Sequence, residues 1–187
     1  MYTTQNETTG ISGKYVITLA DVSHPEAKRI ETMIEGYRDR GDNPAQMKRL
    51  IDVLNNQYAV SRTEVHNLIP TVGRTVLSAR LAGTTTYSGT VNYVALGSGS
   101  TAAANGDTQL TTESYRNAIA SATYASQIAY LTGFFTAAET SGTYAEVGLF
   151  IDGTSTSNTG QLFSHALASI TKTSIQTLTI DWVVTFS

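Results

Sequence analysis

The first third of the chain places its apolar residues three or four positions apart, which is the spacing of one face of an α-helix. Two stripes follow this spacing: Ala27, Ile30, Ile34 and Tyr37, then Met47, Leu50, Ile51, Leu54 and Tyr58. Between the stripes, Gly41 is a typical helix stop, and Asn43-Pro44 is a typical N-cap followed by a first-turn proline. The pattern predicts two short amphipathic helices joined by a tight turn, which is a helical hairpin.

Each predicted helix carries a single apolar stripe, which must be buried against another surface. Ser23 and Glu26 indicate a capping box at the start of the first helix, with Ser23 as its N-cap. The stripes pack either against the β part of the chain or against another subunit. We therefore select a candidate assembly interface that consists of Ile30, Ile34, Tyr37, Met47, Leu50, Leu54 and Tyr58.

A third helix is predicted over residues 70–82, where it packs across a sheet. After Gly83 apolar and polar residues alternate, which is the pattern of a half-buried strand. Strands are predicted at 90–97, 113–120, 127–136, 143–151, 161–168 and 178–186. Turn-forming residues, and no helices, separate these strands, which indicates an antiparallel sandwich or a barrel-like sheet.

These signals place the chain in the α+β class, and mainly β. We expect an antiparallel β-sandwich with one packed helix, preceded by the N-terminal helical hairpin. The predicted organisation is a flexible arm over 1–12, a helical attachment segment over 13–64 and a β-sandwich domain over 65–187.

Composition excludes several classes of protein. The 187 residues contain no cysteine, which excludes disulfide scaffolds, cysteine-based zinc sites, iron–sulfur clusters and thiol nucleophiles. Only 14% of the residues are charged and the net charge is −3, so the charge favours neither nucleic acid nor an anionic membrane as a partner. No apolar run approaches the roughly 18 residues of a membrane-spanning helix, and we expect a soluble protein.

Few residues form a pattern typical of catalysis or cofactor binding. Gly97-Ser98-Gly99-Ser100 is similar to a dinucleotide-binding loop, but turn-forming residues follow it where a helix would have to begin. Ser164 and His165 are adjacent on a predicted strand and point to opposite faces, so they cannot pair as nucleophile and base. The spacing of His24, His66 and His165 favours no metal site. We therefore expect no catalytic residues, no metal and no cofactor.

Carboxylates and tyrosines are the remaining candidates for function. A glycoside hydrolase would need a pair among Glu113, Glu139, Glu146, Asp152 and Asp181, although scattered acids are ordinary in a β domain. The ten tyrosines are more suggestive, because tyrosine combines a flat apolar ring with a polar tip. Such residues favour a protein interface or the stacking of sugars.

An ordered series of motifs after residue 65 is similar to a known group of proteins. The series is NLIPTVGR (67–74), NYVALGSG (92–99), DTQL (107–110), Glu113 with YRN (115–117), FFT (134–136), YAEVGLF (144–150) and LTIDW (178–182). Together these motifs resemble small structural proteins of tailed bacteriophages and the N-terminal, virion-attached domain of tail-collar and tail-fibre proteins. The resemblance covers about residues 65–187.

The resemblance implies a β-rich virion component that acts by assembly, commonly as a multimer and often as a trimer, with no catalytic residues. The sequence ends directly after the last predicted strand, without a fibre shaft or a receptor-binding tip. We therefore expect a short baseplate, collar or fibre-adaptor protein in the tail or the tail-proximal region. Its expected partners are other virion proteins and further copies of itself, with neither nucleic acid nor membrane.

Other readings remain open. A head decoration protein would place the chain on the head surface. A carbohydrate-binding module would use exposed tyrosines to bind a host surface glycan. An enzyme, such as a glycan depolymerase, comes third and would depend on the carboxylates named above.

Overall fold

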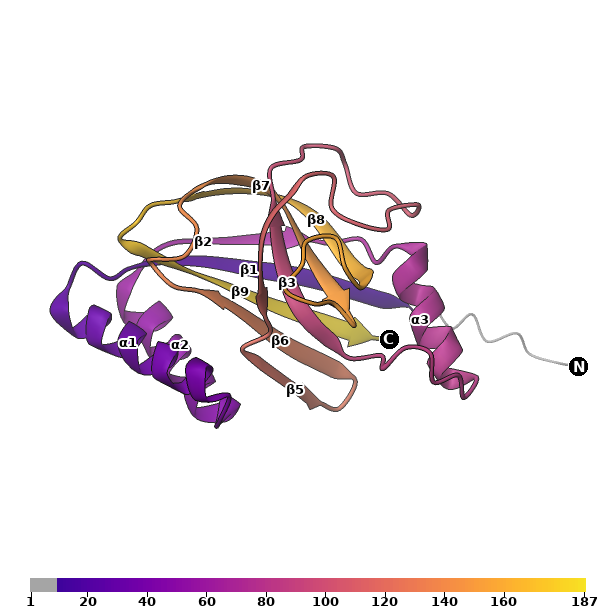
Figure 1. Cartoon of the computed structure of the whole chain (residues 1–187), viewed down its shortest axis with the longest axis horizontal. Coiled ribbons are helices and arrows are strands. Elements are labelled where there is room, and N and C mark those ends of the chain that lie inside the picture. The colour runs from indigo at the N-terminus through magenta and orange to yellow at the C-terminus, as the bar shows by residue number, and fades with distance from the viewer. Residues whose placement is uncertain (1–9) are drawn as a thin grey trace, which may run out of the picture.

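The computed structural model describes residues 10–187, which are 44% strand and 24% helix. They form two antiparallel sheets and three helices, so the expected α+β, mainly β class is confirmed (Figure 1). Of the arm expected over residues 1–12, the first nine residues lie outside the described part, and Ile11 and Ser12 belong to a strand.

Strands distant in sequence lie side by side in the first sheet, which has five strands in the order β2-β1-β9-β6-β5. In that order their bounds are Ala59–His66, Ile11–Asp21, Gln176–Phe186, Ile128–Phe135 and Ser121–Ala125. β1 pairs with β9 over its whole length. Beyond these strands, Gly10 and Ser187 exchange backbone hydrogen bonds, so both ends of the described part meet.

The second sheet has four strands in the order β4-β3-β7-β8. Their bounds are Glu113–Ala118, Val91–Gly97, Gly142–Ile151 and Gln161–Lys172. One apolar core lies between the sheets. It contains Tyr15, Ile17, Leu178, Ile180 and Trp182 from the first sheet and Val94, Leu96, Val147, Leu149 and Phe163 from the second.

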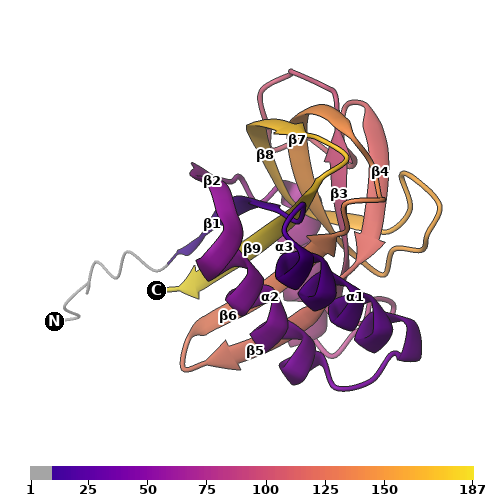
Figure 2. The ribbon, with the colours of Figure 1, turned by 90° about the vertical axis from the view of Figure 1, so that its left-hand side faces the viewer.

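The helices α1 (Pro25–Arg40) and α2 (Pro44–Tyr58) lie side by side over the five-stranded sheet (Figure 2). Gly41 ends α1 in the left-handed conformation, and the Asn43 side chain caps the first turn of α2, as predicted. The predicted cap of α1 is wrong by one residue. His24 is the N-cap, and its Nδ1 accepts the backbone N–H of Glu26 at 3.2 Å, whereas the N–H of Ser23 donates to Asp21.

The expectation that residues 13–64 form a helical segment ahead of the sheet needs correction. This range begins within β1 and ends within β2, and α1 and α2 are inserted between these two neighbouring strands. The reason is that Tyr15, Ile17 and Leu19 lie on one face of an extended segment, which pairs with β9 and fills the core between the sheets.

The remaining predicted elements agree with the structure. α3 (Thr71–Leu81) packs against β8, and the six predicted strands correspond to β3, β4, β6, β7, β8 and β9. Three strands, β1, β2 and β5, were not predicted. Within residues 10–187, no helix combines the length and the apolar character needed to cross a membrane.

Candidate functional site

The candidate assembly interface on the helices lies inside the molecule. Ile30, Ile34, Met47 and Leu54 are buried in a second apolar cluster, and Tyr37, Leu50 and Tyr58 are partly buried against it. The other side of this cluster comes from the chain itself, through Ala20, Ala120 and Phe134. The prediction that these seven residues form an interface with another subunit therefore needs correction. Their stripe covers the outer face of the five-stranded sheet of the same chain.

Charged contacts add to this attachment of the helices. Arg38 donates to both carboxylate oxygens of Glu139 at 2.9 Å, and the backbone N–H of Ala137 donates to Glu31 at 2.5 Å. Glu31 is fully buried and also pairs with Lys28 at 2.7 Å. α1 is thus bound to the loop between β6 and β7 by polar contacts as well as by apolar packing.

The same loop is held from the other side by Lys172, a buried residue of β8. Its Nζ donates to the carbonyl oxygens of Ala137 at 3.2 Å and of Glu139 at 2.7 Å. Burial lowers the pKa of the Lys172 ammonium below its usual range, and the carboxylates of Glu31 and Glu139 act in the opposite direction. Lys172 acts here as a structural donor to a loop.

The glycine-rich loop after β3 binds a carboxylate of the protein itself. Glu146, fully buried on β7, accepts the backbone N–H groups of Gly99 at 3.0 Å, Thr111 at 2.9 Å and Thr112 at 2.7 Å. A Cβ on Gly97 or Gly99 would overlap the Glu146 side chain. The Gly99 N–H of the loop that resembles a phosphate-binding loop is therefore occupied by Glu146, and the overlap explains why glycine stands at both positions.

His165 continues this buried polar chain toward the surface. Its Nε2 lies 3.1 Å from Glu146, and its Nδ1 lies 2.8 Å from Asp107, which is partly exposed. Ser164 lies on the opposite face of β8, where its hydroxyl accepts hydrogen bonds from Tyr15 at 2.7 Å and Asn67 at 2.6 Å. The prediction that Ser164 and His165 do not pair is confirmed, and the Asp107–His165–Glu146 chain was not predicted.

The five carboxylates singled out in the sequence do not converge. Their hydrogen-bond partners are Arg116 for Glu113, Arg38 for Glu139, His165 for Glu146, Ser88 for Asp152 and Thr132 for Asp181. Each carboxylate is therefore engaged in its own local contact. In the part of the chain that the structure describes, no three His, Asp or Glu side chains gather as a metal site would require. His24 instead stacks on Tyr58.

Arg116 organises the long loop between β7 and β8. Its guanidinium forms a two-pronged pair with the buried carboxylate of Glu113, at 2.5 and 2.6 Å, and donates to the carbonyl oxygens of Thr154 and Thr159. The guanidinium also lies 4.5 Å from the ring centroid of Phe150. In the sequence, Glu113 and Arg116 stand out only as part of a motif. Nothing near them in the sequence indicates that they pair or that Arg116 binds the loop over residues 154–159.

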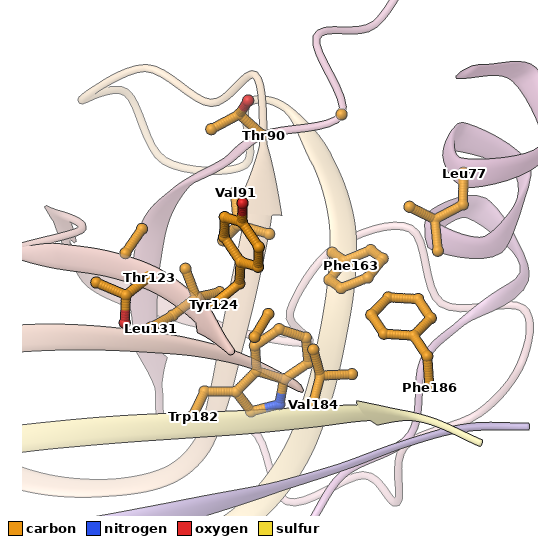
Figure 3. A pocket seen from close by; sticks show the side chains of 13 residues that line it. Leu77, Thr90, Val91, Thr123, Tyr124, Leu131, Phe163, Trp182, Val184 and Phe186 are labelled. Carbon is orange, nitrogen blue, oxygen red and sulfur yellow. The ribbon is translucent and has the colours of Figure 1, made fainter. Parts of the chain in front are cut away.

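An apolar groove opens between the sheets and α3 (Figure 3). Its volume is about 320 Å³, and its aromatic residues are Tyr124, Phe163, Trp182 and Phe186. Figure 3 shows Tyr124 on one side, beside Val91, and Leu77 of α3 on the other. Among the residues that the structure describes, no charged side chain lines the groove, and Tyr124 is 84% exposed. The groove suits a neutral, largely apolar or flat group.

The comparisons with known proteins add no relative. The chain matches no protein-family model, and no curated protein and no solved structure matches it.

Proposed function

We propose that this chain is a non-enzymatic structural protein of a tailed-phage virion, a baseplate, collar or fibre-adaptor component that acts by assembling with further copies and with other virion proteins. In this proposal the two sheets form a β-sandwich, and α1 and α2 are its helical hairpin. The virion role in this proposal rests on the resemblance of the sequence motifs to tailed-phage structural proteins.

One observation supports a structural role above the others. The charged residues within the recognised motifs have partners inside the chain: Glu113 with Arg116, Asp107 with His165, Glu146 with three backbone N–H groups, and Asp181 with Thr132. Such motifs support a fold and its loops. A catalytic centre would instead direct reactive groups toward one substrate position.

The test is to locate the chain in purified particles of the phage that encodes it. Mass spectrometry of the particles and labelling with an antibody against this chain should find it in stoichiometric amounts at the tail or near it. A label on the head surface would favour a decoration protein. Particles that lack the chain would contradict the proposal.

A carbohydrate-binding module is the second candidate, because the exposed ring of Tyr124 stands beside the groove with the hydroxyls of Thr90 and Thr123. Flat aromatic rings with nearby hydroxyl groups suit a neutral sugar. Micromolar binding on a glycan array that is lost in Tyr124→Ala would favour this function. Absence of binding, or binding that Tyr124→Ala leaves unchanged, would remove it.

A further inference from the structure

β2 is an edge strand. Within residues 10–187 it pairs with β1 alone, and Leu68, just beyond its end, forms an isolated bridge to His165 of β8. Every residue of β2 except Val65 is exposed. In Figure 2 the strand lies at the margin of its sheet. An exposed edge strand is a template for pairing with another strand unless its sequence prevents it. From Ser61 to His66, β2 contains neither proline nor lysine, two residues that protect edge strands from such pairing.

The register of β2 against β1 fixes which backbone groups point outward. Asn67 donates its N–H to Gly13, and Lys14 lies opposite His66. Because hydrogen bonding alternates along an antiparallel pair, Thr63 and Val65 direct their backbone groups toward β1. The N–H and C=O groups of Arg62, Glu64 and His66 therefore point away from the sheet.

Among the registers centred on Arg62, Thr63 and Glu64, charge favours one for two copies of β2. Only registers that place outward residues opposite outward residues make hydrogen bonds. A two-fold axis at Arg62 would face arginine with arginine, and an axis at Glu64 would face glutamate with glutamate. An axis at Thr63 places Arg62 of each copy opposite Glu64 of the other. Unlike charges opposite each other stabilise a pair of strands, and like charges destabilise it.

The side chains needed for this register are in place. Glu64 pairs with Lys14 at 2.8 Å on the same face, whereas Arg62 takes part in no ion pair within residues 10–187. Arg62 is thus an exposed cation. The register with its axis at Thr63 places the Glu64 carboxylate of the second copy opposite it.

We propose that β2 pairs antiparallel with β2 of a second copy, with Thr63 opposite Thr63 at the two-fold axis. The two five-stranded sheets then form one continuous sheet. Arg62 and Glu64 form two equivalent cross-strand pairs, each exchanging both backbone hydrogen bonds. The pair deepens the proposed assembly role and rests on it, since it names the surface and the symmetry of the first contact.

Charge reversal on the full chain tests the pair. Native mass, measured by light scattering across a concentration series, should be twice the 20.0 kDa of one chain. Arg62→Glu or Glu64→Arg alone should raise the dimer dissociation constant about tenfold or more, because each creates two like-charge contacts. The double variant Arg62→Glu/Glu64→Arg should restore dimerisation, and so should an equimolar mixture of the two single variants.

Arg49→Glu is the matched control, a reversal at an exposed position of α2 that should leave the mass unchanged. Circular dichroism confirms that each variant folds. A dimer that is insensitive to both single variants, or a failure of both the double variant and the mixture to dimerise, would overturn the pair. A stable trimer would overturn it and still support the assembly role. A monomer at every concentration would overturn the β2 pair, and the particle experiment above then decides the assembly role separately.

Discussion

The carboxylate of Glu146 accepts the backbone N–H of Gly99 at 3.0 Å, at a point where a side chain on residue 99 would collide with it. A Cβ on Gly97 would collide with the same carboxylate. The loop that resembles an anion-binding site therefore binds the Glu146 carboxylate of the neighbouring strand β7.

Gly97→Ala and Gly99→Ala should each lower the free energy of unfolding by about 2 kcal/mol or more, since the added methyl group displaces a buried carboxylate and leaves its donors unpaired. Gly106→Ala is the matched control, because nothing lies within 4 Å of the Cβ that it would add. It should change stability by less than about 0.5 kcal/mol. Urea denaturation measures all three. Equal losses of stability for Gly99→Ala and Gly106→Ala would contradict the predicted collision with Glu146.

Arg116→Met should destabilise the chain by about 3–5 kcal/mol, because it leaves the Glu113 carboxylate buried without its partner. The same change should expose the loop over residues 154–159, whose carbonyl oxygens Arg116 binds, to limited proteolysis. The double variant Arg116→Met/Glu113→Leu should be more stable than Arg116→Met alone, since no unpaired charge remains. If the double variant is the less stable of the two, the desolvation argument fails.

Ile34→Ala should cost about 2–5 kcal/mol, because Ile34 is fully buried between α1 and the five-stranded sheet. Its sequence neighbour Met33 is 42% exposed, and Met33→Ala should cost less than about 1 kcal/mol. Thermal or urea denaturation distinguishes the two. Comparable losses would indicate that the stripe is buried elsewhere, for example against another subunit.

Tyr15 should make stability fall at high pH. Burial raises the pKa of its phenol well above the ordinary 10.0, and the Ser164 hydrogen bond opposes this only in part. Above pH 10 the unfolded chain therefore loses the proton that the folded chain keeps, so stability present below pH 10 is lost as pH rises. The expected slope is about 1.4 kcal/mol per pH unit for this group.

Tyr15→Phe isolates that contribution. Near neutral pH it should cost about 1 kcal/mol, the value of its hydrogen bond to Ser164. Between about pH 8 and pH 11 the wild type should lose about 1 kcal/mol more than the variant, even though Tyr115 and Tyr144 titrate in both. Parallel pH profiles would show that the Tyr15 phenol is not protected.

All strands after Gly83 except β5 could be predicted, because their alternation is strong and turn residues separate them. β1 has a similar alternation at Tyr15, Ile17 and Leu19, but it precedes two helices, and its partner β9 lies at the other end of the sequence. β2 is an exposed edge strand with little apolar signal. The local sequence patterns of β1 and β2 do not show which strand pairs with each, because the partners lie far away along the chain.

The polar clusters could not be predicted for a related reason. Asp107 lies in a loop, Glu146 on β7 and His165 on β8, so only the fold brings them together. The sequence did exclude a serine–histidine pair, because that argument needs only the alternation of neighbouring residues on one strand. The apolar stripes were correctly identified, but periodicity alone does not distinguish a sheet of the same chain from another subunit.

The placement of α1 and α2 between β1 and β2 constrains the order of folding. During synthesis the helices emerge early, but the surface that they cover needs Phe134 of β6, and β1 needs β9 as its inner neighbour. Their apolar stripes stay uncovered until most of the chain has left the ribosome. Folding should therefore be slow and limited by non-local pairing, and nascent chains that stop before β9 should bind chaperones or aggregate.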